Sequence, residues 1–424
     1  MPRKIAATPV NGRPRRHSNL GEDIRGDTSA AAVATMPTTA EQREASRFRR
    51  RTLSKERRRP RNWFTIYREA SYRHTWLNPL IAIIVGFVGY LVNPKETNPL
   101  HSAIFLSYPI GPDPSYHQDP TAQQYGKGTK DINFVIFYTF FFSFTREFLM
   151  QRYLRPLAHR CGITKKGKVA RFMEQTYTAI YFSFFVPWGL WILYKTEIWR
   201  FNTLSTRAFY ENYPHRTHTA EFKAYYLLQA AYWLQQAIVL MLQLEKPRSD
   251  FKELVLHHIV TVSLIALSYR FHFTWIGLAV FFTHDCSDFF LATSKTLNYL
   301  DHPLIGPYFG FFIFVWIYMR HYINLRIIWS LFTEFRTVGP WLLDWEAGFY
   351  KCFLAQTITT GLLGSIQALN LFWLYFIIRI AKRFVMQKEA VDERSEDEAE
   401  EESDEPVKTD VKTPEITVNG EKKI

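Results

Sequence analysis

The stretch LVLHHIVTVSLIALSYRFHFTWIGLAVFFTHDCSDFFLATSKTLNYL (254–300) decides how this chain folds. It contains two apolar runs, 254–271 and 275–293, on either side of a short break near His272. Each run is close to the roughly 20 residues that a helix needs to cross a bilayer. The stretch therefore predicts a hairpin of two antiparallel membrane-spanning helices.

This hairpin carries ionisable side chains where a membrane span ordinarily has none. His257 lies 15 residues before the break, and Asp285 and Asp288 lie 13 and 16 residues after it, with His284 beside them. Because each residue adds about 1.5 Å to a helix, these side chains reach nearly the same depth, ~20 Å from the turn. An ionisable residue in a span costs at least about 2.5–3.5 kcal/mol on insertion scales. The cluster therefore predicts either a reactive site or a structural lock between the two helices.

Residue types leave three interpretations of the cluster open. The first is a His–Asp hydrogen bond that only locks the helices together. The second is a metal site, which the ligand types allow. Adjacent positions on a helix point about 100° apart, however, so His257 and His258 do not easily share one ion. The HxxHH box of membrane di-iron enzymes and elongases is also incomplete, because Leu254 stands three residues before His257.

The third interpretation, acyl transfer, fits the residue types best. A carboxylate beside a histidine fixes the imidazole tautomer and stabilises the imidazolium, while the imidazole acts as a base or as a nucleophile. An amine acceptor would need such a base, because it is largely protonated at neutral pH. We therefore predict an acyltransferase site without a metal.

The rest of the chain also has the composition of a membrane protein. Hydrophobic residues make up 47% and aromatic residues 17% of the sequence, and long stretches between Trp76 and Ile380 carry little charge, which excludes a soluble enzyme. Three cysteines are too few and too scattered for a disulfide framework or a thiolate metal site. The apolar runs predict eight spans, at 76–92, 132–149, 175–194, 225–244, 254–271, 275–293, 306–326 and 353–380.

Charge predicts the orientation of these spans. An even number of spans places both termini on one side, and the segment 151–171 after the second span carries seven Lys or Arg residues and no acid. By the positive-inside rule that side is the cytosol. If the first two spans formed a re-entrant pair, the remaining spans would keep this orientation.

The two ends of the chain are charged and of opposite sign. Residues 1–62 carry a net charge of +10 and residues 386–424 a net charge of −8, and both have too few apolar residues to form a core. We expect both to be disordered. A basic arm just before a first span favours anionic membrane lipid over nucleic acid as its partner. Ser395 lies among acidic residues, as acidophilic kinases prefer, which predicts a phosphoprotein.

At the level of motifs, the chain resembles the ceramide synthases, which are membrane proteins with a TLC domain. The resemblance covers about 168–385, and the two preceding spans and the acidic tail are similar to fungal members. The residues that resemble the family's Lag motif, with a supporting segment, are DFKELVLHHIVT (250–261), SY (268–269), HDCSDFFL (284–291), K-x-x-NY (295–299) and IYMRHYINLRI (317–327).

The resemblance implies an all-α polytopic protein of the endoplasmic reticulum membrane whose last six spans form a barrel. It also implies N-acylation of a sphingoid base, dihydrosphingosine or phytosphingosine, by a fatty acyl-CoA, which is a substrate and not a cofactor. A small single-span regulatory subunit and a homo- or hetero-dimer with a paralogue are the protein partners it implies. The implied division is a basic arm (1–62), two spans with a basic loop (63–167), the TLC domain (168–385) and an acidic tail (386–424).

The resemblance also suggests roles for the polar residues of the hairpin. His257 would attack the thioester to give an acyl-imidazole, with Asp285 and Asp288 orienting the ring and balancing its charge. His258 would be a second base or a structural partner, and His284 is a further candidate for substrate binding. Direct transfer with His257 as a general base stays open.

Basic residues are the candidates for holding the polyanionic CoA head in cytosolic water. Those near the predicted mouth are Lys168, Arg171, Arg248 and Lys252, although basic loops of this kind also serve only to set topology. Arg320 lies within or near the apolar slab, where it would meet a hydroxyl, a phosphate or an Asp, or else extend to the interface. The loop 333–352 would cap the lumenal end of the barrel.

The competing hypothesis is a non-catalytic TLC-domain protein that binds lipid or accompanies the translocon. Such a distant relative typically lacks the complete HH…HD-x-x-D set, which this chain has.

Overall fold

The computed structural model describes residues 62–112, 121–200, 203–245 and 249–387. The chain divides into two compact units, Met1–Glu69 and Ala70–Ile424. Of the first, the structure describes residues 62–69, most of which belong to the helix α2 (Trp63–Arg73), and α2 has no buried residue. The predicted arm up to residue 61 and the predicted tail from residue 388, with Ser395, lie outside the described residues.

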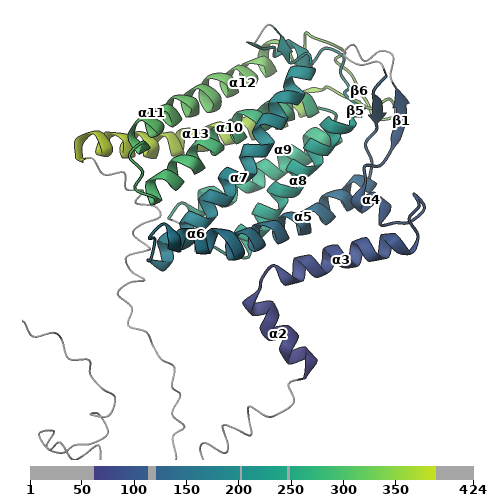
Figure 1. Ribbon diagram of the computed structural model, residues 1–424. Coiled ribbons are helices and arrows are strands. Elements are labelled where there is room, and N and C mark those ends of the chain that lie inside the picture. The colour runs from purple at the N-terminus through teal and green to yellow at the C-terminus, as the bar shows by residue number, and fades with distance from the viewer. Residues whose placement is uncertain (1–61, 113–120, 201–202, 246–248, 388–424) are drawn as a thin grey trace, which may run out of the picture. The chain divides into compact units, whose positions relative to one another are not determined.

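The second unit is built almost wholly of helices (Figure 1). Its long helical segments are α3 (Leu77–Val92), α5 (Lys130–Leu149), α7 (Lys166–Lys195), α8 (Ala220–Met241), α9 (Phe251–Arg270), α10 (Thr274–Tyr299), α11 (Ile305–Trp316) continuing through η4 (Ile317–Ile323) into α12 (Asn324–Thr333), and α13 (Phe353–Gln387). Shorter segments are α4 (His101–Ile104), η2 (Met150–Leu154), α6 (Arg155–Arg160) and η3 (Arg207–Phe209).

Short antiparallel strands join the helices at one end of the unit. They form a three-stranded sheet and two hairpins, in the order β1-β2-β5, β3-β4 and β6-β7. Their bounds are β1 (Pro109–Pro112), β2 (Gln123–Tyr125), β3 (Trp199–Arg200), β4 (Thr203–Leu204), β5 (His218–Thr219), β6 (Leu343–Asp344) and β7 (Phe349–Tyr350).

The predicted hairpin is present as α9 and α10. The turn between them contains His272, whose φ of 64° lies in the left-handed region, so the helical hydrogen-bond pattern ends there. The backbone N–H of Phe271 still bonds to the carbonyl of Leu267 at 2.9 Å and closes the last turn of α9. The two helices therefore run in opposite directions, and the first half of α9 and the second half of α10 line one cavity.

Each of the eight predicted spans is helical, but fewer than eight meet the length and hydropathy of a span. Five helices in the described residues do, and a sixth does if α2 and α3 together form one span. Alone, α3 has only 16 residues, and α8 and α10 carry many polar side chains, which lower their hydropathy. The structure thus shows a mostly helical protein with five or six candidate spans, and it does not by itself define a barrel.

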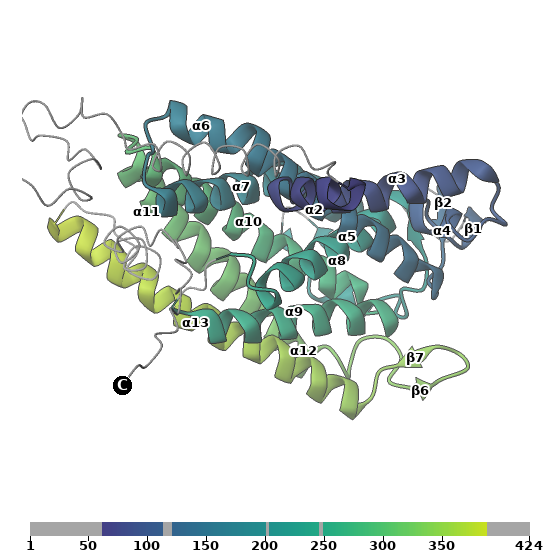
Figure 2. The ribbon, with the colours of Figure 1, turned by 90° about the horizontal axis from the view of Figure 1, so that it is seen from below.

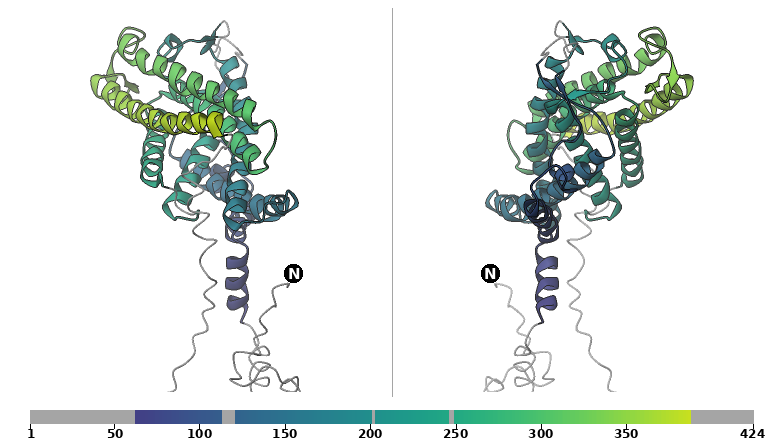
Figure 3. Two further views of the ribbon diagram at one scale, coloured as in Figure 1. Left: turned by 90° about the vertical axis from the view of Figure 1, so that its left-hand side faces the viewer. Right: turned by 90° about the vertical axis from the view of Figure 1, so that its right-hand side faces the viewer.

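Helix packing brings segments far apart in the sequence side by side. α7 packs along α10, and α8 packs on both α5 and α9 (Figures 1 and 2). α13 packs on α9 and lies along α12 and η4, as Figure 3 shows in yellow-green beside green. Much of the core between α7 and α8 is aromatic: Tyr181 stacks on Phe185 at 4.2 Å and on Tyr232 at 3.5 Å between ring centroids.

Candidate active site

A cavity of about 250 Å³ lies among α7, α8, α9, α10, α11 with η4, and α13. Five of the predicted site residues line it: His257 and His258 from α9, Asp288 from α10, Arg320 from η4 and Arg171 from α7. The antiparallel course of α9 and α10 explains why His257 and Asp288 meet there although they are far apart in the sequence. The π-helical turns of η4 carry Arg320, and such local widening of a helix is frequent at functional sites.

His257 is held in the cavity wall by aromatic rings. Its imidazole packs edge-on against Trp233 at 5.8 Å and against Trp373 at 5.3 Å between ring centroids. Its Nδ1 atom is buried without a hydrogen-bond partner among the described residues, and the residue lines the cavity. His258 lies 5.6 Å from His257, and its Nδ1 is likewise buried and unpartnered in that part of the chain.

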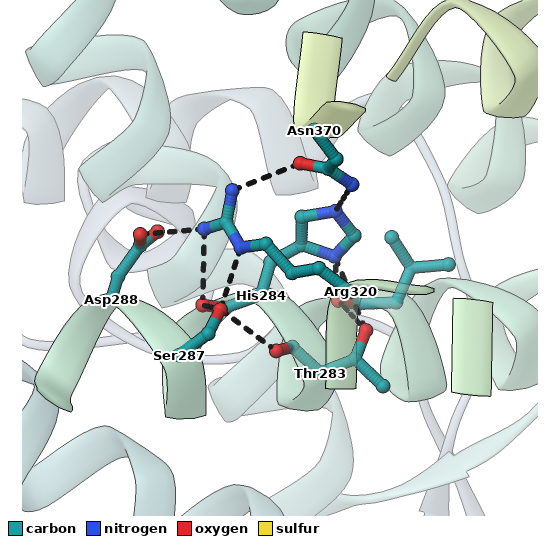
Figure 4. Close-up of polar contacts among 7 residues, drawn as sticks. Thr283, His284, Ser287, Asp288, Arg320 and Asn370 are labelled. Carbon is teal, nitrogen blue, oxygen red and sulfur yellow. Dashed lines mark hydrogen bonds and ion pairs between the residues drawn. The ribbon is translucent and has the colours of Figure 1, made fainter. Parts of the chain in front are cut away.

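Asp288 and Arg320 form an ion pair in the same wall. An Nη2–H of Arg320 donates to Oδ1 of Asp288 at 2.5 Å, and the guanidinium is only 2% exposed (Figure 4). Nε–H of Arg320 donates to Oγ of Ser287 at 2.6 Å, and the guanidinium carbon lies 4.2 Å from the centre of the Trp316 ring. Arg320 therefore lies inside the protein and does not extend to an interface.

Asp285 lies one turn from Asp288 but is separated from the cavity. It does not line the cavity, and its carboxylate accepts a hydrogen bond from Nε2 of Gln229 on α8. Gln229 also donates to the Tyr225 hydroxyl at 3.0 Å and accepts from the Tyr181 hydroxyl at 3.0 Å. The two carboxylates therefore have different surroundings, because Asp288 pairs with Arg320 and Asp285 bonds to Gln229. No hydrogen bond joins either aspartate to His257 within the described residues.

His284 uses both ring nitrogens inside the protein. Nδ1 lies 2.9 Å from the carbonyl oxygen of Val280, and Nε2 lies 3.3 Å from the side-chain nitrogen of Asn370 (Figure 4). His284 does not line the cavity, although we predicted it as a residue that binds substrate. In this structure it holds α10 and α13 together.

The predicted CoA-binding residues are not grouped at the cavity. Arg171 lines it but pairs with Glu174 at 3.0 Å. Lys168 and Lys252 are exposed and do not line it, and Arg248 lies outside the described residues. Lys295, which sequence reasoning did not select, does line it.

On α13, Asn370 and Trp373 are the main part of the site that sequence reasoning missed. Gln367, Asn370 and Trp373 follow one another at intervals of three residues, so they lie near one face of the helix. Nε1–H of Trp373 donates to Asp250 at 3.2 Å. Gln367 does not line the cavity, and its side-chain amide bonds to Nδ1 of His321 at 2.8 Å and accepts from Asn324 at 2.8 Å. The spacing of these polar residues within an apolar run is the sequence pattern that could have identified them.

A second cavity, of about 170 Å³, lies among α9, α10, α13 and the β6–β7 hairpin. Its lining is almost wholly apolar and includes Leu264, Phe281, Trp345 and Leu363. The predicted capping loop borders it, because β6 and β7 lie within 333–352.

That loop is anchored by a buried lysine. Nζ of Lys351 donates to the carbonyl oxygen of Val338 at 2.5 Å and lies 5.3 Å from the centre of the Tyr210 ring. Burial lowers the pKa of Lys351 to about 8 from an ordinary value of 10.5. The loop therefore holds a lysine whose charged form is disfavoured by burial among aromatic rings.

Five or six candidate spans in the described residues, packed around a polar cavity, define the class as a multi-pass membrane protein, and a model of the TLC domain matches residues 171–379. The chain is 48% identical to a sphingosine N-acyltransferase of Schizosaccharomyces pombe, over 87% of this chain and 91% of that protein. It is 49% identical to a sphingosine N-acyltransferase-like protein of Gibberella moniliformis, over 81% and 87%. It is 42% identical to a ceramide synthase of Saccharomyces cerevisiae, over 91% and 92%.

The chain therefore belongs to the sphingosine N-acyltransferase (ceramide synthase) family, as its Lag motif predicted.

Proposed function

We propose that this protein is a ceramide synthase, which joins the acyl group of a fatty acyl-CoA to the amine of a sphingoid base. The observation that carries the proposal is the cavity that His257, His258, Asp288 and Arg320 line together, in a chain of this family. A non-catalytic lipid-binding protein has no need for two imidazoles and an ion pair around one polar cavity.

The reaction would proceed in two steps at His257. Nε2 attacks the thioester carbonyl, the carbon–sulfur bond breaks, and CoA leaves as the thiolate while the imidazole becomes an acyl-imidazolium. The amine of the sphingoid base then attacks the same carbon, the imidazole leaves, and the amine gives up a proton as the amide forms. His258 lines the same cavity and is the candidate base for that proton.

The two aspartates would have separate tasks. Asp288 faces the cavity, so its carboxylate would balance the positive charge that develops on His257, with Arg320 holding it in place. Asp285 is bonded to Gln229 behind the cavity, so it would fix the orientation of α10 against α8. Direct attack by the amine, with His257 as a general base, is the alternative.

The two cavities would divide the acyl-CoA. The apolar cavity would take the far end of the acyl chain, and its border with β6 and β7 would let the loop 333–352 influence chain length. The CoA head would remain in water at the opposite end, near Arg171 and Lys295. Lys168, Lys252 and Arg248 would add positive charge around that mouth.

We propose that α8 and α10 cross the membrane with the five helices that pass as spans, because both are packed among them. With α3, this would give eight spans and place both termini in the cytosol, as the basic segment 151–171 favours. Helices α7 to α13 pack in the cyclic order α7, α8, α9, α13, α12 with η4, and α10, which supports a six-helix barrel. This barrel would form the 168–385 domain in the endoplasmic reticulum membrane, alone, as a dimer or with a single-span subunit.

Ceramide formation by purified protein tests the function. The protein would be incubated with a sphingoid base and a series of acyl-CoAs, and ceramide would be measured by mass spectrometry. A His257→Ala protein that extracts equally well is the control. If neither the protein alone nor the protein with its membrane partners makes ceramide above that control, the protein is a lipid-binding member of the family.

A further inference from the structure

Asn370 is the side chain at which two parts of the polar network meet. It is fully buried on α13 and belongs to none of the motifs quoted from the sequence. Its Oδ1 accepts a hydrogen bond from Nη1 of Arg320 at 3.1 Å, and its Nδ2 lies 3.3 Å from Nε2 of His284 (Figure 4). One amide thus connects the η4 guanidinium with the α10 imidazole.

The direction of each bond in this network is fixed by Arg320. A guanidinium has only donors, so Asn370 must present its oxygen to Arg320 and its NH₂ group to His284. Nε2 of His284 must then accept, which leaves the ring proton on Nδ1. The partner of Nδ1 is the carbonyl oxygen of Val280 at 2.9 Å, which can only accept, so both ends of the network agree.

We propose that Asn370 is a positioning residue for the reaction: it holds Arg320 where the guanidinium pairs with Asp288 at the cavity wall, and it keeps His284 in a single tautomer. The proposal rests on the function proposed above, because that function gives the Asp288–Arg320 pair at the cavity a role in the reaction. Asn370 itself does not line the cavity, so it acts through Arg320 and not by touching a substrate.

The physical reason lies in how Arg320 is held. Its other bonds go to Asp288, to Ser287 at 2.6 Å and to the backbone oxygen of His284 at 3.3 Å, and all three acceptors belong to α10. Asn370 supplies the bond from the opposite side, from α13. Without it, a buried N–H loses its acceptor, and the guanidinium can move and take the Asp288 carboxylate with it.

Steady-state kinetics of Asn370→Leu and a matched control test the positioning role. Gln367→Leu removes a buried amide of the same kind from the same helix, but its partners are His321 and Asn324. We expect Asn370→Leu to lower kcat about 100-fold, as small misplacements in an active site do, with little change in the KM of either substrate. Gln367→Leu should keep its kcat. Equal losses in both variants would reduce Asn370 to an ordinary core residue.

An exchange of the carboxylate separates positioning from simple ion pairing. Asn370→Asp places an acid on the other side of Arg320, and combining it with Asp288→Asn restores one ion pair to the guanidinium. We expect the double variant to melt above Asn370→Asp alone, because Arg320 then has a single carboxylate partner, and yet to remain inactive, because that carboxylate no longer faces the cavity. Recovery of activity in the double variant would overturn the proposal.

A measurement that needs no enzymatic activity keeps the proposal distinct from the proposed function. The thermal stabilities of Asn370→Leu, Asp288→Asn and the double variant form a cycle, and coupled residues give losses that do not add. We expect coupling through Arg320, and additive losses would contradict the link between Asn370 and Asp288. Wild-type protein that makes no ceramide but shows the coupling would refute the function while leaving the network intact.

Discussion

The carboxylate of Asp288 lies 2.5 Å from the guanidinium of Arg320, and this ion pair joins the middle of α10 to the π-helical turns of η4. Both partners come from segments that the sequence marked separately, and both line the cavity that contains His257. Because the two side chains form one ion pair in the cavity wall, a substitution of either residue should change the stability that the other one contributes.

Removing the guanidinium should therefore destabilise the protein more than removing both charges. Arg320→Met leaves Asp288 in the protein interior without its cation, which costs about 3–5 kcal/mol for a buried pair. Asp288→Asn in the same chain removes the unpaired charge, so the double variant should melt above Arg320→Met. Thermal melting of detergent-purified protein measures this, and a lower melting temperature for the double variant would contradict the pairing.

His257→Ala should abolish ceramide formation in protein that still inserts, extracts and melts normally. The imidazole contacts aromatic rings and has no hydrogen bond that holds the helices together among the described residues, so its loss should leave the packing largely intact. Activity and melting temperature are measured on the same preparation. A large drop in the melting temperature would instead favour a structural histidine.

Asp288→Asn should lose more activity than Asp285→Asn. At 288 the negative charge faces the cavity, and its loss should lower kcat by about 100-fold or more. At 285 the asparagine oxygen can still accept the hydrogen bond from Gln229, so much of the local structure is retained. Kinetics of both variants at saturating substrate provide the comparison, and equal losses would show that both carboxylates act in the reaction.

Protein given acyl-CoA without a sphingoid base should acquire one acyl group on His257. Mass spectrometry of the peptide around 254–261 should show the added mass, with free CoA released in equal amount, and later addition of the base should remove it as ceramide. The absence of an adduct under conditions of fast turnover would favour direct transfer. An adduct on His258 would show that His258, and not His257, is the nucleophile.

The stability of the loop between α12 and α13 should depend on alkaline pH through Lys351. The folded protein releases the lysine proton near pH 8, whereas the unfolded chain keeps it up to about pH 10.5. The stabilisation from this difference is complete above about pH 10.5 and is lost as the pH falls through about 8. The melting temperature of wild-type protein should therefore rise between pH 7.5 and 9.5 relative to Lys351→Met, and parallel curves would contradict it.

The hairpin was predictable because its evidence is local. A break in two apolar runs and the constant rise of a helix place His257 and Asp288 at one depth, and the structure brings them to one cavity. Composition also located the helical segments, since all eight predicted spans are helical. The number that cross a membrane was less predictable, because the polar residues that build the interior of α8 and α10 also lower their hydropathy.

The partners of the polar residues were not predictable, because they depend on packing between distant segments. Asp285 and Asp288 lie about 60° apart around α10, so their spacing in the sequence does not distinguish their roles. Packing against α8 gives Asp285 to Gln229, and packing against η4 gives Asp288 to Arg320. Likewise, nothing in the apolar run of α13 indicates that Asn370 meets both Arg320 and His284.

The position of these partners on α13 has a consequence for how the protein is made. The Lag motif is complete when residue 299 has left the ribosome, but Asn370 and Trp373 belong to α13, the last helix among the described residues. A nascent chain that has inserted everything up to residue 352 carries His257, Asp288 and Arg320 without the helix that closes around them. The assembled site therefore comes into existence only after α13 has been synthesised, so a chain arrested or truncated before it exposes the motif without a working centre.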